Sequence, residues 1–182
     1  MSRSVLAGSR HPNSKPGCTV LLEIPRYYGH HATIITQDSK HALKTARNQI
    51  MTGARIIIIG FFAAFYCMLR NLAFLIGGPL FSNDIEKVDK QDDRAAARLF
   101  SAATVGFHFD KQPDQIGLSI YLFVLGELID AWQNRNNFHR DRVKMVLRAR
   151  FFLMAWRSHI VAHPDRNLST HFISRESLLH SS

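Results

Sequence analysis

Arg157 and His163 are the residues whose types and spacing could together do chemistry. They lie six positions apart in the stretch 155–166, which reads AWRSHIVAHPDR. An arginine side chain can hold a phosphate through two parallel hydrogen bonds. A histidine titrates near neutral pH, so it can donate or accept a proton or hold a phosphate ester in line. The pair therefore suggests phosphodiester chemistry.

The spacing alone is weak evidence, because short motifs often occur by chance. Three other Arg–His pairs have a similar spacing of five positions and lie in segments rich in Pro, Gly, Ser or Asn, namely Arg26 with His31, Arg166 with His171, and Arg175 with His180. Only the pair of Arg157 and His163 follows an apolar helical pattern and precedes a helix-ending proline, Pro164. The competing interpretation is a surface arginine and a histidine at the negative end of a helix dipole.

Helical geometry limits how Arg157 and His163 can meet. Six residues of an ideal helix turn by about 600°, which leaves the two side chains about 120° apart around the axis. The pair converges only if the helix loosens around Val161 or if a second subunit completes the site.

This stretch resembles the signature of the HEPN ribonuclease superfamily, in which an arginine is followed after four to six residues by a histidine. A small polar residue after the arginine, then Val-Ala-His and an acidic residue, make it most similar to the abortive-infection-protein-U-like branch. The resemblance implies a small all-helical bundle that dimerises and places two Arg/His pairs in one cleft. It assigns catalysis to Arg157 and His163, and we expect Ser158 and His159 to support them. Most relatives have Asn, Asp or His at the position of Ser158.

The chemistry that the resemblance implies is metal-independent cleavage of RNA. The 2′-hydroxyl attacks its own adjacent phosphate and leaves a 2′,3′-cyclic phosphate and a 5′-hydroxyl. Arg157 would neutralise charge on the phosphoryl oxygens, and His163 would position the phosphate or move the proton. DNA lacks this nucleophile, so we expect it not to be cut.

His159 and His163 also form a nominal metal pair, because they lie four residues apart on one helical face. The glutamate and the third ligand of a zinc hydrolase helix are missing. We therefore expect no metal site and no cofactor.

The composition favours one domain with an anionic partner. The chain has 182 residues, 46% of them hydrophobic, which suffices for one core. Its formal net charge of +9 indicates nucleic acid first and an acidic lipid surface second. Positive charge gathers in 135–166, where the predicted RNA-binding residues are Arg140, Lys144, Arg148, Arg150 and Arg166. The alternative for these residues is an ordinary solvated helix side.

The pattern along the chain predicts an all-α fold, a HEPN-like bundle of four to five helices with an irregular N-terminal leader. We expect the leader at 1–37, the helical domain at 38–166 and a polar tail at 167–182. Within the tail, four apolar residues could dock as a short helix, namely Phe172, Ile173, Leu178 and Leu179.

Helical periodicity and breaking residues locate the expected elements. A long helix is expected over 39–76, and its fourteen uncharged residues 56–69 are too few to span a bilayer, which predicts a buried bundle helix. The later elements are a helix over 95–105, a loop over 107–113, a helix from Pro113 to Trp132, a break at 134–137 and a helix over 138–162. The last helix is expected to bury four apolar side chains, Val143, Leu147, Phe151 and Met154.

Three functions are compatible with these features. The first is an RNA endonuclease, a cytoplasmic homodimer that serves as the toxin or effector of a defence or toxin and antitoxin system, with an antitoxin or regulatory protein as a further partner. The second is a catalytically inactive HEPN-like module for RNA binding or dimerisation, suggested by Ser158. The third is a membrane-associated helical protein in which 56–76 inserts while Arg55 and Arg70 reach towards head groups. A membrane partner is the least expected of these.

Overall fold

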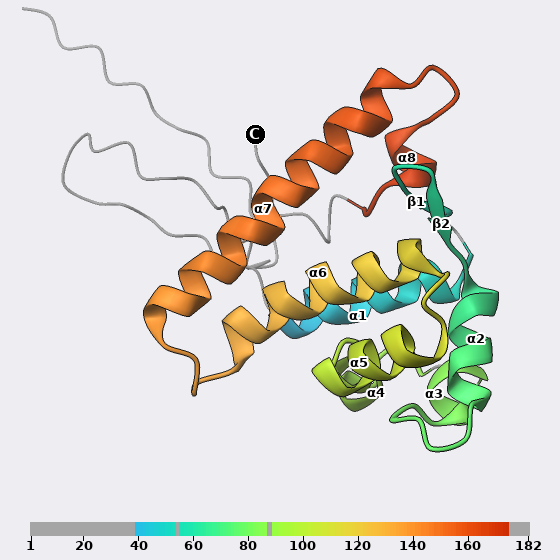
Figure 1. Cartoon of the computed structure of the whole chain (residues 1–182), viewed down its shortest axis with the longest axis vertical. Helices are drawn as coiled ribbons and strands as arrows, with labels where there is room; N and C mark the ends of the chain where they lie inside the picture. Colours follow the sequence, from blue (N-terminus) through green and yellow to red (C-terminus); the bar gives the residue numbers. More distant parts are fainter. Residues whose placement is uncertain (1–38, 54, 87–88, 175–182) are drawn as a thin grey trace, which may run out of the picture.

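Eight helices and one two-stranded hairpin make up residues 39–53, 55–86 and 89–174, the part of the chain that the computed structural model describes (Figure 1). In chain order the elements are α1 (Ser39–Met51), β1 (Ile57–Ile59), β2 (Phe62–Ala64), α2 (Tyr66–Phe74), α3 (Ser82–Glu86), α4 (Asp93–Leu99), α5 (Ala102–Lys111), α6 (Ile116–Gln133), α7 (His139–Ala162) and α8 (Leu168–His171). Within this part, five helices have nine or more residues, namely α1, α2, α5, α6 and α7. The prediction of an all-α bundle is confirmed, and the predicted leader lies outside the described residues.

Helix α6 is the centre of the bundle, because it contacts α1, α5, α7 and both strands of the hairpin. A Cβ atom at Gly126 would lie 2.5 Å from the carbonyl oxygen of Phe100, and one at Gly117 would lie 2.7 Å from that of Ala63. Glycine at these positions therefore lets two neighbouring segments approach α6 closely. Of the described helices, α6 is the one long and apolar enough to cross a membrane, but 61% of it is buried, as expected for a core helix.

A β-hairpin interrupts the segment for which one long helix was predicted, so the prediction for 39–76 is wrong. Helix α1 ends at Met51, and the four consecutive isoleucines 56–59 lead into strand β1, which suits β-branched side chains. The antiparallel strands pair Ile57 with Ala64, Ile58 with Ala63 and Ile59 with Phe62. Gly60, with a φ of 61°, takes the first place of the two-residue turn, where glycine is favoured.

The segment 56–76 is therefore a hairpin followed by the nine-residue helix α2, and the predicted buried helix over 56–69 is wrong as well. Arg70, for which the sequence named no partner, lies exposed on α2 and pairs with Glu86 at 3.2 Å. Its guanidinium also lies over the ring of Phe74.

Helices α4 and α5 replace the single helix predicted over 95–105. Helix α4 ends with Phe100 as its C-cap. The Ser101 side chain then caps α5 by accepting a hydrogen bond from the Thr104 backbone N–H at 3.2 Å. Helix α5 then continues to Lys111, so the prediction of a loop over 107–113 is wrong for all but its last two residues.

The acidic connector, residues 83–86 and 89–94, caps helix α4 and forms ion pairs. The Asp92 side chain caps α4 by accepting hydrogen bonds from the backbone N–H groups of Arg94 and Ala95. Asp84 forms an ion pair with Arg98. The buried Arg47 on α1 donates to the carbonyl oxygens of Asp89, at 2.6 Å, and Asp92, at 3.0 Å. These contacts attach the connector to α1.

Helix α7 has nearly the bounds that the sequence predicts, but it buries a different face. Its buried residues are Ala149, Leu153, Trp156 and Ile160. The four side chains predicted to be buried are more than a third exposed, namely Val143, Leu147, Phe151 and Met154. That prediction is wrong because α7 carries apolar residues on two sides, and the side that contains Trp156 is the one that packs.

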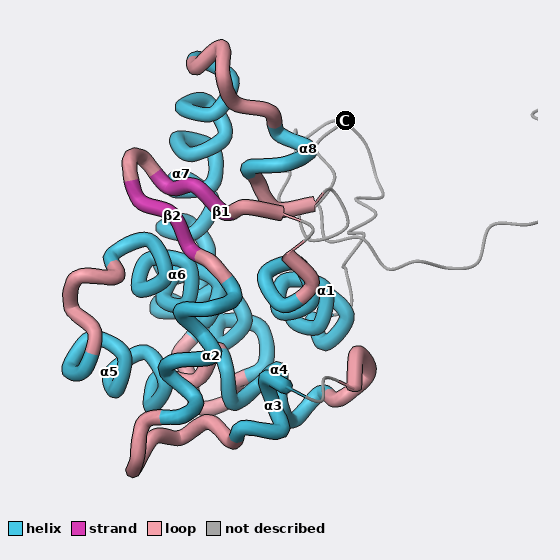
Figure 2. Tube along the Cα trace, turned by 90° about the vertical axis from the view of Figure 1, so that its right-hand side faces the viewer, coloured by secondary structure: helices cyan, strands magenta, loops and turns pink. Residues whose placement is uncertain are grey.

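The folded unit extends past the predicted domain boundary at residue 166. Phe172 and Ile173 are buried in the core, and the side chain and backbone of Ser174 are hydrogen-bonded to the Gln49 side chain. Arg55 donates to the carbonyl oxygens of Leu168 and Phe172. Figure 2 shows α8 beside α7, with the hairpin nearby.

Candidate functional site

The predicted motif lies at the C-terminal end of α7, next to the turn of the hairpin (Figure 2). Helix α7 continues through Ala162, and His163 is its C-cap, with its backbone N–H donating to the Ile160 carbonyl oxygen at 3.3 Å. Pro164 follows and cannot continue the helix. The chain then turns back, so that Arg166 lies beside the last turn of α7.

Two histidines pair in this last turn. The ring of His163 lies 4.3 Å from the ring of His159, centroid to centroid, because residues four apart share a helix face. Nδ1 of His163 lies 2.9 Å from the carbonyl oxygen of His159. A carbonyl oxygen can only accept, so Nδ1 of His163 carries a proton. The neutral His163 ring then presents a lone pair at Nε2, which has no partner among the described residues.

Arg166 joins the histidine pair to the hairpin. Its Nη1 lies 2.7 Å from Nε2 of His159 and 2.9 Å from the carbonyl oxygen of Gly60. A guanidinium group only donates, so Nε2 of His159 accepts and the neutral His159 ring carries its proton on Nδ1. The result is a fixed positive charge beside the His159 ring.

Phe61 completes this group on the hairpin side. Its ring is 87% exposed and meets the His159 ring edge-on, with centroids 6.4 Å apart. The Trp156 indole N–H donates to the carbonyl oxygen of Ile58, which attaches the hairpin to α7. We refer to Phe61, His159, His163 and Arg166 as the α7-end cluster.

Arg157 does not belong to the α7-end cluster. Its side chain is exposed and forms no hydrogen bond or ion pair with any described residue. Because α7 stays helical through Ala162, the loosening around Val161 that would let the pair converge within one subunit does not occur. The side chains of Arg157 and His163 therefore lie about 120° apart around the axis and about 9 Å apart along it. One subunit does not bring them together.

Arg157 lies instead beside an exposed apolar stripe on α7. Leu147, Met154 and Val161 recur every seven residues and are 39%, 54% and 61% exposed. Arg157 and Ser158 flank this stripe, because they lie three and four residues after Met154. This stripe is where a second copy of the chain could bring Arg157 towards another histidine.

The residues predicted to bind RNA divide into three groups. Arg140 is exposed, and Arg150 is half-buried. Lys144 forms an ion pair with Asp141 and Arg148 one with Glu127, which partly neutralises the predicted basic stripe. Arg166 belongs to the α7-end cluster.

Gly60 and Phe61 are the residues that sequence reasoning missed. The signal that could have found them is a glycine between four isoleucines and two phenylalanines, which is typical of a hairpin turn. The prediction of one helix over 39–76 is incompatible with such a turn.

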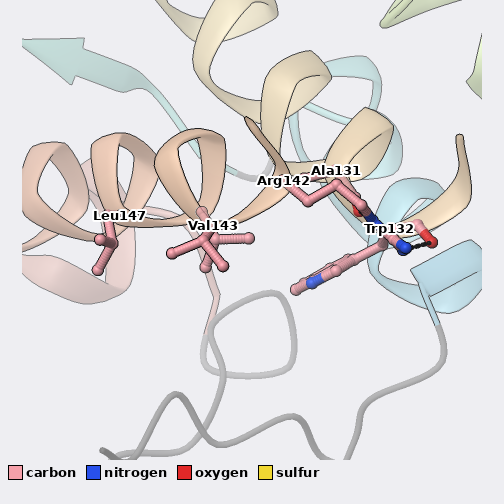
Figure 3. Close-up of a pocket in the computed structure, with 6 residues that line it drawn as sticks. Ala131, Trp132, Arg142, Val143 and Leu147 are labelled. Carbon is pink, nitrogen blue, oxygen red and sulfur yellow. Dashed lines mark hydrogen bonds between the residues drawn. The ribbon is translucent and has the colours of Figure 1, made fainter. Parts of the chain in front are cut away.

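A separate apolar hollow of about 310 Å³ lies at the other end of α7, against the end of α6 (Figure 3). Its lining residues are Ala131, Trp132, Arg142, Val143, Val146 and Leu147. Arg142 donates to the carbonyl oxygens of Ala131 and Trp132 and so caps the last turn of α6. The hollow contains no residue of the predicted motif.

Neither a family model, nor a curated protein, nor a solved structure matches this chain. The class of protein defined by fold and site is a basic, mainly helical domain with a histidine and arginine cluster at the end of its longest described helix.

Proposed function

We propose that the chain is a metal-independent RNA endonuclease of the HEPN type, which leaves 2′,3′-cyclic phosphate and 5′-hydroxyl ends. The observation that carries this proposal is the His163 ring. Its Nδ1 is bound to the carbonyl oxygen of His159, and its Nε2 has no partner among the described residues, while Arg166 binds the neighbouring His159 ring. A histidine with one fixed and one available nitrogen suits proton transfer at a ribose-linked phosphate.

In the proposed reaction the 2′-oxygen forms a bond to phosphorus, and the bond from phosphorus to the 5′-oxygen breaks. Nε2 of His163 accepts the proton of the 2′-hydroxyl, and the same ring then gives a proton to the leaving 5′-oxygen. Atoms and charge balance without water. Arg157 and Arg166 stabilise the charge that develops on the phosphoryl oxygens.

The proposal requires two copies of the chain, because Arg157 and His163 lie on different sides of α7. The exposed stripe of Leu147, Met154 and Val161 offers an apolar surface for a twofold contact between two α7 helices. A contact there places both Arg157 side chains at the junction. Each could then serve the histidine of the other copy.

Cleavage of single-stranded RNA by the purified chain in EDTA tests the proposal. Arg157→Ala and His163→Ala should each lower the rate by about 10²-fold or more, since one stabilising group at a transition state has about that effect. The expected products end in a 2′,3′-cyclic phosphate, and DNA of the same sequence stays intact. Arg94→Ala, which removes an exposed arginine on α4, is the matched control and should leave the rate within a few-fold. An unchanged rate in His163→Ala would remove the proposal.

Mixing the two inactive variants tests whether the site is shared between copies. If Arg157 of one copy serves His163 of the other, a mixed dimer contains one intact site. An equal mixture should recover about a quarter of the wild-type rate, because half of the dimers are mixed and each has one of two sites. No recovery, with exchange of subunits verified, would contradict a shared site.

A second candidate is a catalytically inactive module that binds RNA or dimerises. The observation that favours it is the separation of Arg157 from His163 within one subunit. It predicts RNA binding that weakens steeply with salt and yields no cyclic phosphate.

The biological role that we propose is a cytoplasmic effector of a defence or toxin and antitoxin system, controlled by an antitoxin or regulatory protein. The resemblance of the motif supports this role. Growth of cells that express the wild type or His163→Ala tests it, because only the wild type should arrest growth.

A further inference from the structure

Phe61 is an apolar residue whose side chain lies almost entirely in solvent. It follows Gly60 in the hairpin turn, and its exposed fraction of 87% is the largest among the phenylalanines that the structure describes. An exposed ring of this size offers a free apolar face to a ligand.

The turn that carries Phe61 is held from two sides. Arg166 donates to the carbonyl oxygen of Gly60 at 2.9 Å, and the Trp156 indole N–H donates to that of Ile58. The backbone that carries Phe61 is thus held in place before any ligand arrives. A preorganised contact binds more tightly, because less ordering is needed on association.

The groups around Phe61 are polar and suit an anionic ligand. The edge of His159 meets the ring, and Arg166 donates both to that histidine and to the residue before Phe61. The His163 ring lies 4.3 Å from the His159 ring, centroid to centroid. An exposed aromatic face, a fixed guanidinium and an imidazole with a lone pair together match one nucleotide: a base to stack and a phosphate to bind.

We propose that Phe61 stacks on a base of single-stranded RNA next to the phosphate that the α7-end cluster binds, and so makes the site selective for unpaired RNA. This inference rests on the proposed function and adds a substrate class to it. The bases of a duplex are stacked on each other and present no free face, so a duplex cannot make this contact. Phe61 is a substrate contact and takes no part in proton transfer.

Binding of a fully 2′-O-methylated oligonucleotide tests the inference without cleavage, because the nucleophile is blocked. Phe61→Ala should bind the single strand about 10-fold or more weakly, and Phe61→Trp should retain the affinity, since any aromatic ring can stack. Binding of the corresponding duplex should be the same in all three proteins. Phe138→Ala is the matched control, because Phe138 is 79% exposed and lies at the opposite end of α7.

A single abasic position in the oligonucleotide links the effect to stacking. When the abasic position is moved along the strand, wild-type binding should weaken at one place. An abasic position at that place should not weaken binding of Phe61→Ala further, since both changes remove the same contact.

The first two of the following outcomes overturn this inference alone. If the wild type cleaves RNA and Phe61→Ala binds the single strand normally, the stacking inference is overturned and the nuclease stands. If Phe61→Ala loses affinity equally for single strand and duplex, selectivity through stacking is also overturned. If the folded wild type binds neither form, both proposals fail.

Discussion

His159 and His163 differ in which ring nitrogen is engaged, and this decides what each can do. His163 donates from Nδ1 to a carbonyl oxygen one turn earlier and keeps Nε2 available. His159 accepts from Arg166 at Nε2, so that nitrogen cannot take up a proton without losing the contact. His163 is thus the better proton acceptor, and His159 is better suited to holding Arg166 in place.

We expect nitrogen-15 NMR spectra at about pH 8, where free histidine is neutral, to show both rings protonated at Nδ1. Arg166→Ala removes the donor to His159, so His159 should become a mixture of tautomers while His163 keeps its Nδ1 proton. A wild-type His163 that carries its proton on Nε2 would contradict the geometry on which its proposed role depends.

At the scale of elements, the hairpin and α7 form one functional unit. Trp156 and Arg166 connect the α7 end to strand β1 and to the turn, across about a hundred residues of sequence. The turn requires Gly60 to adopt a φ of 61°, which other residues adopt only with strain. The hairpin conformation and the placement of Arg166 are therefore coupled.

Gly60→Ala should lower the free energy of unfolding by about 1 kcal/mol, because a Cβ there meets open space and only the backbone conformation is penalised. Gly106→Ala in α5 is the matched control. A Cβ at Gly106 also meets open space, but its φ is not positive, so alanine there should stabilise by up to about 1 kcal/mol. Urea unfolding measures both changes, and effects of the same sign would contradict this account.

At the scale of the whole molecule, a buried histidine makes stability depend on pH. His108 is fully buried between α5 and α6, with Nδ1 2.9 Å from the Ser119 hydroxyl and Nε2 3.4 Å from the Gln115 side-chain oxygen. Burial lowers the pKa of His108 below 6.5. The unfolded chain therefore binds more protons than the folded one as the pH falls below that value.

We expect the free energy of unfolding to be highest above pH 6.5 and to fall as the pH drops below it, because acid favours the unfolded chain with a charged His108. His108→Gln should flatten this dependence, since glutamine keeps a donor and an acceptor but does not titrate in this range. Urea unfolding at several pH values measures it. A wild-type stability that rises as the pH falls from neutral would contradict the sign.

A second decrease in the free energy of unfolding, due to Asp84, is expected at lower pH. Burial opposes ionisation of Asp84, but the hydrogen bonds from Arg98 and from the Phe81 backbone outweigh it, so the pKa of Asp84 is lowered from 3.8. Its contribution is present above that value and disappears as the pH falls further.

Local signals in the sequence determined the longest helices and the separation within the motif. Pro113, the asparagines around 134–137 and Pro164 act on their own backbone, so the bounds of α6 and α7 follow from the sequence to within a few residues. The angle between Arg157 and His163 follows in the same way, because helix geometry sets it.

Only the tertiary structure decided which faces and which distant residues meet. The isoleucines 56–59 satisfy a helical and a strand pattern alike, and contact with α6, α7 and α8 selects the strand. Helix α7 has two apolar sides, and packing on α6 selects the one with Trp156. The contact of Arg166 with Gly60 joins residues 106 positions apart, which no local pattern encodes, because it exists only once the chain has folded.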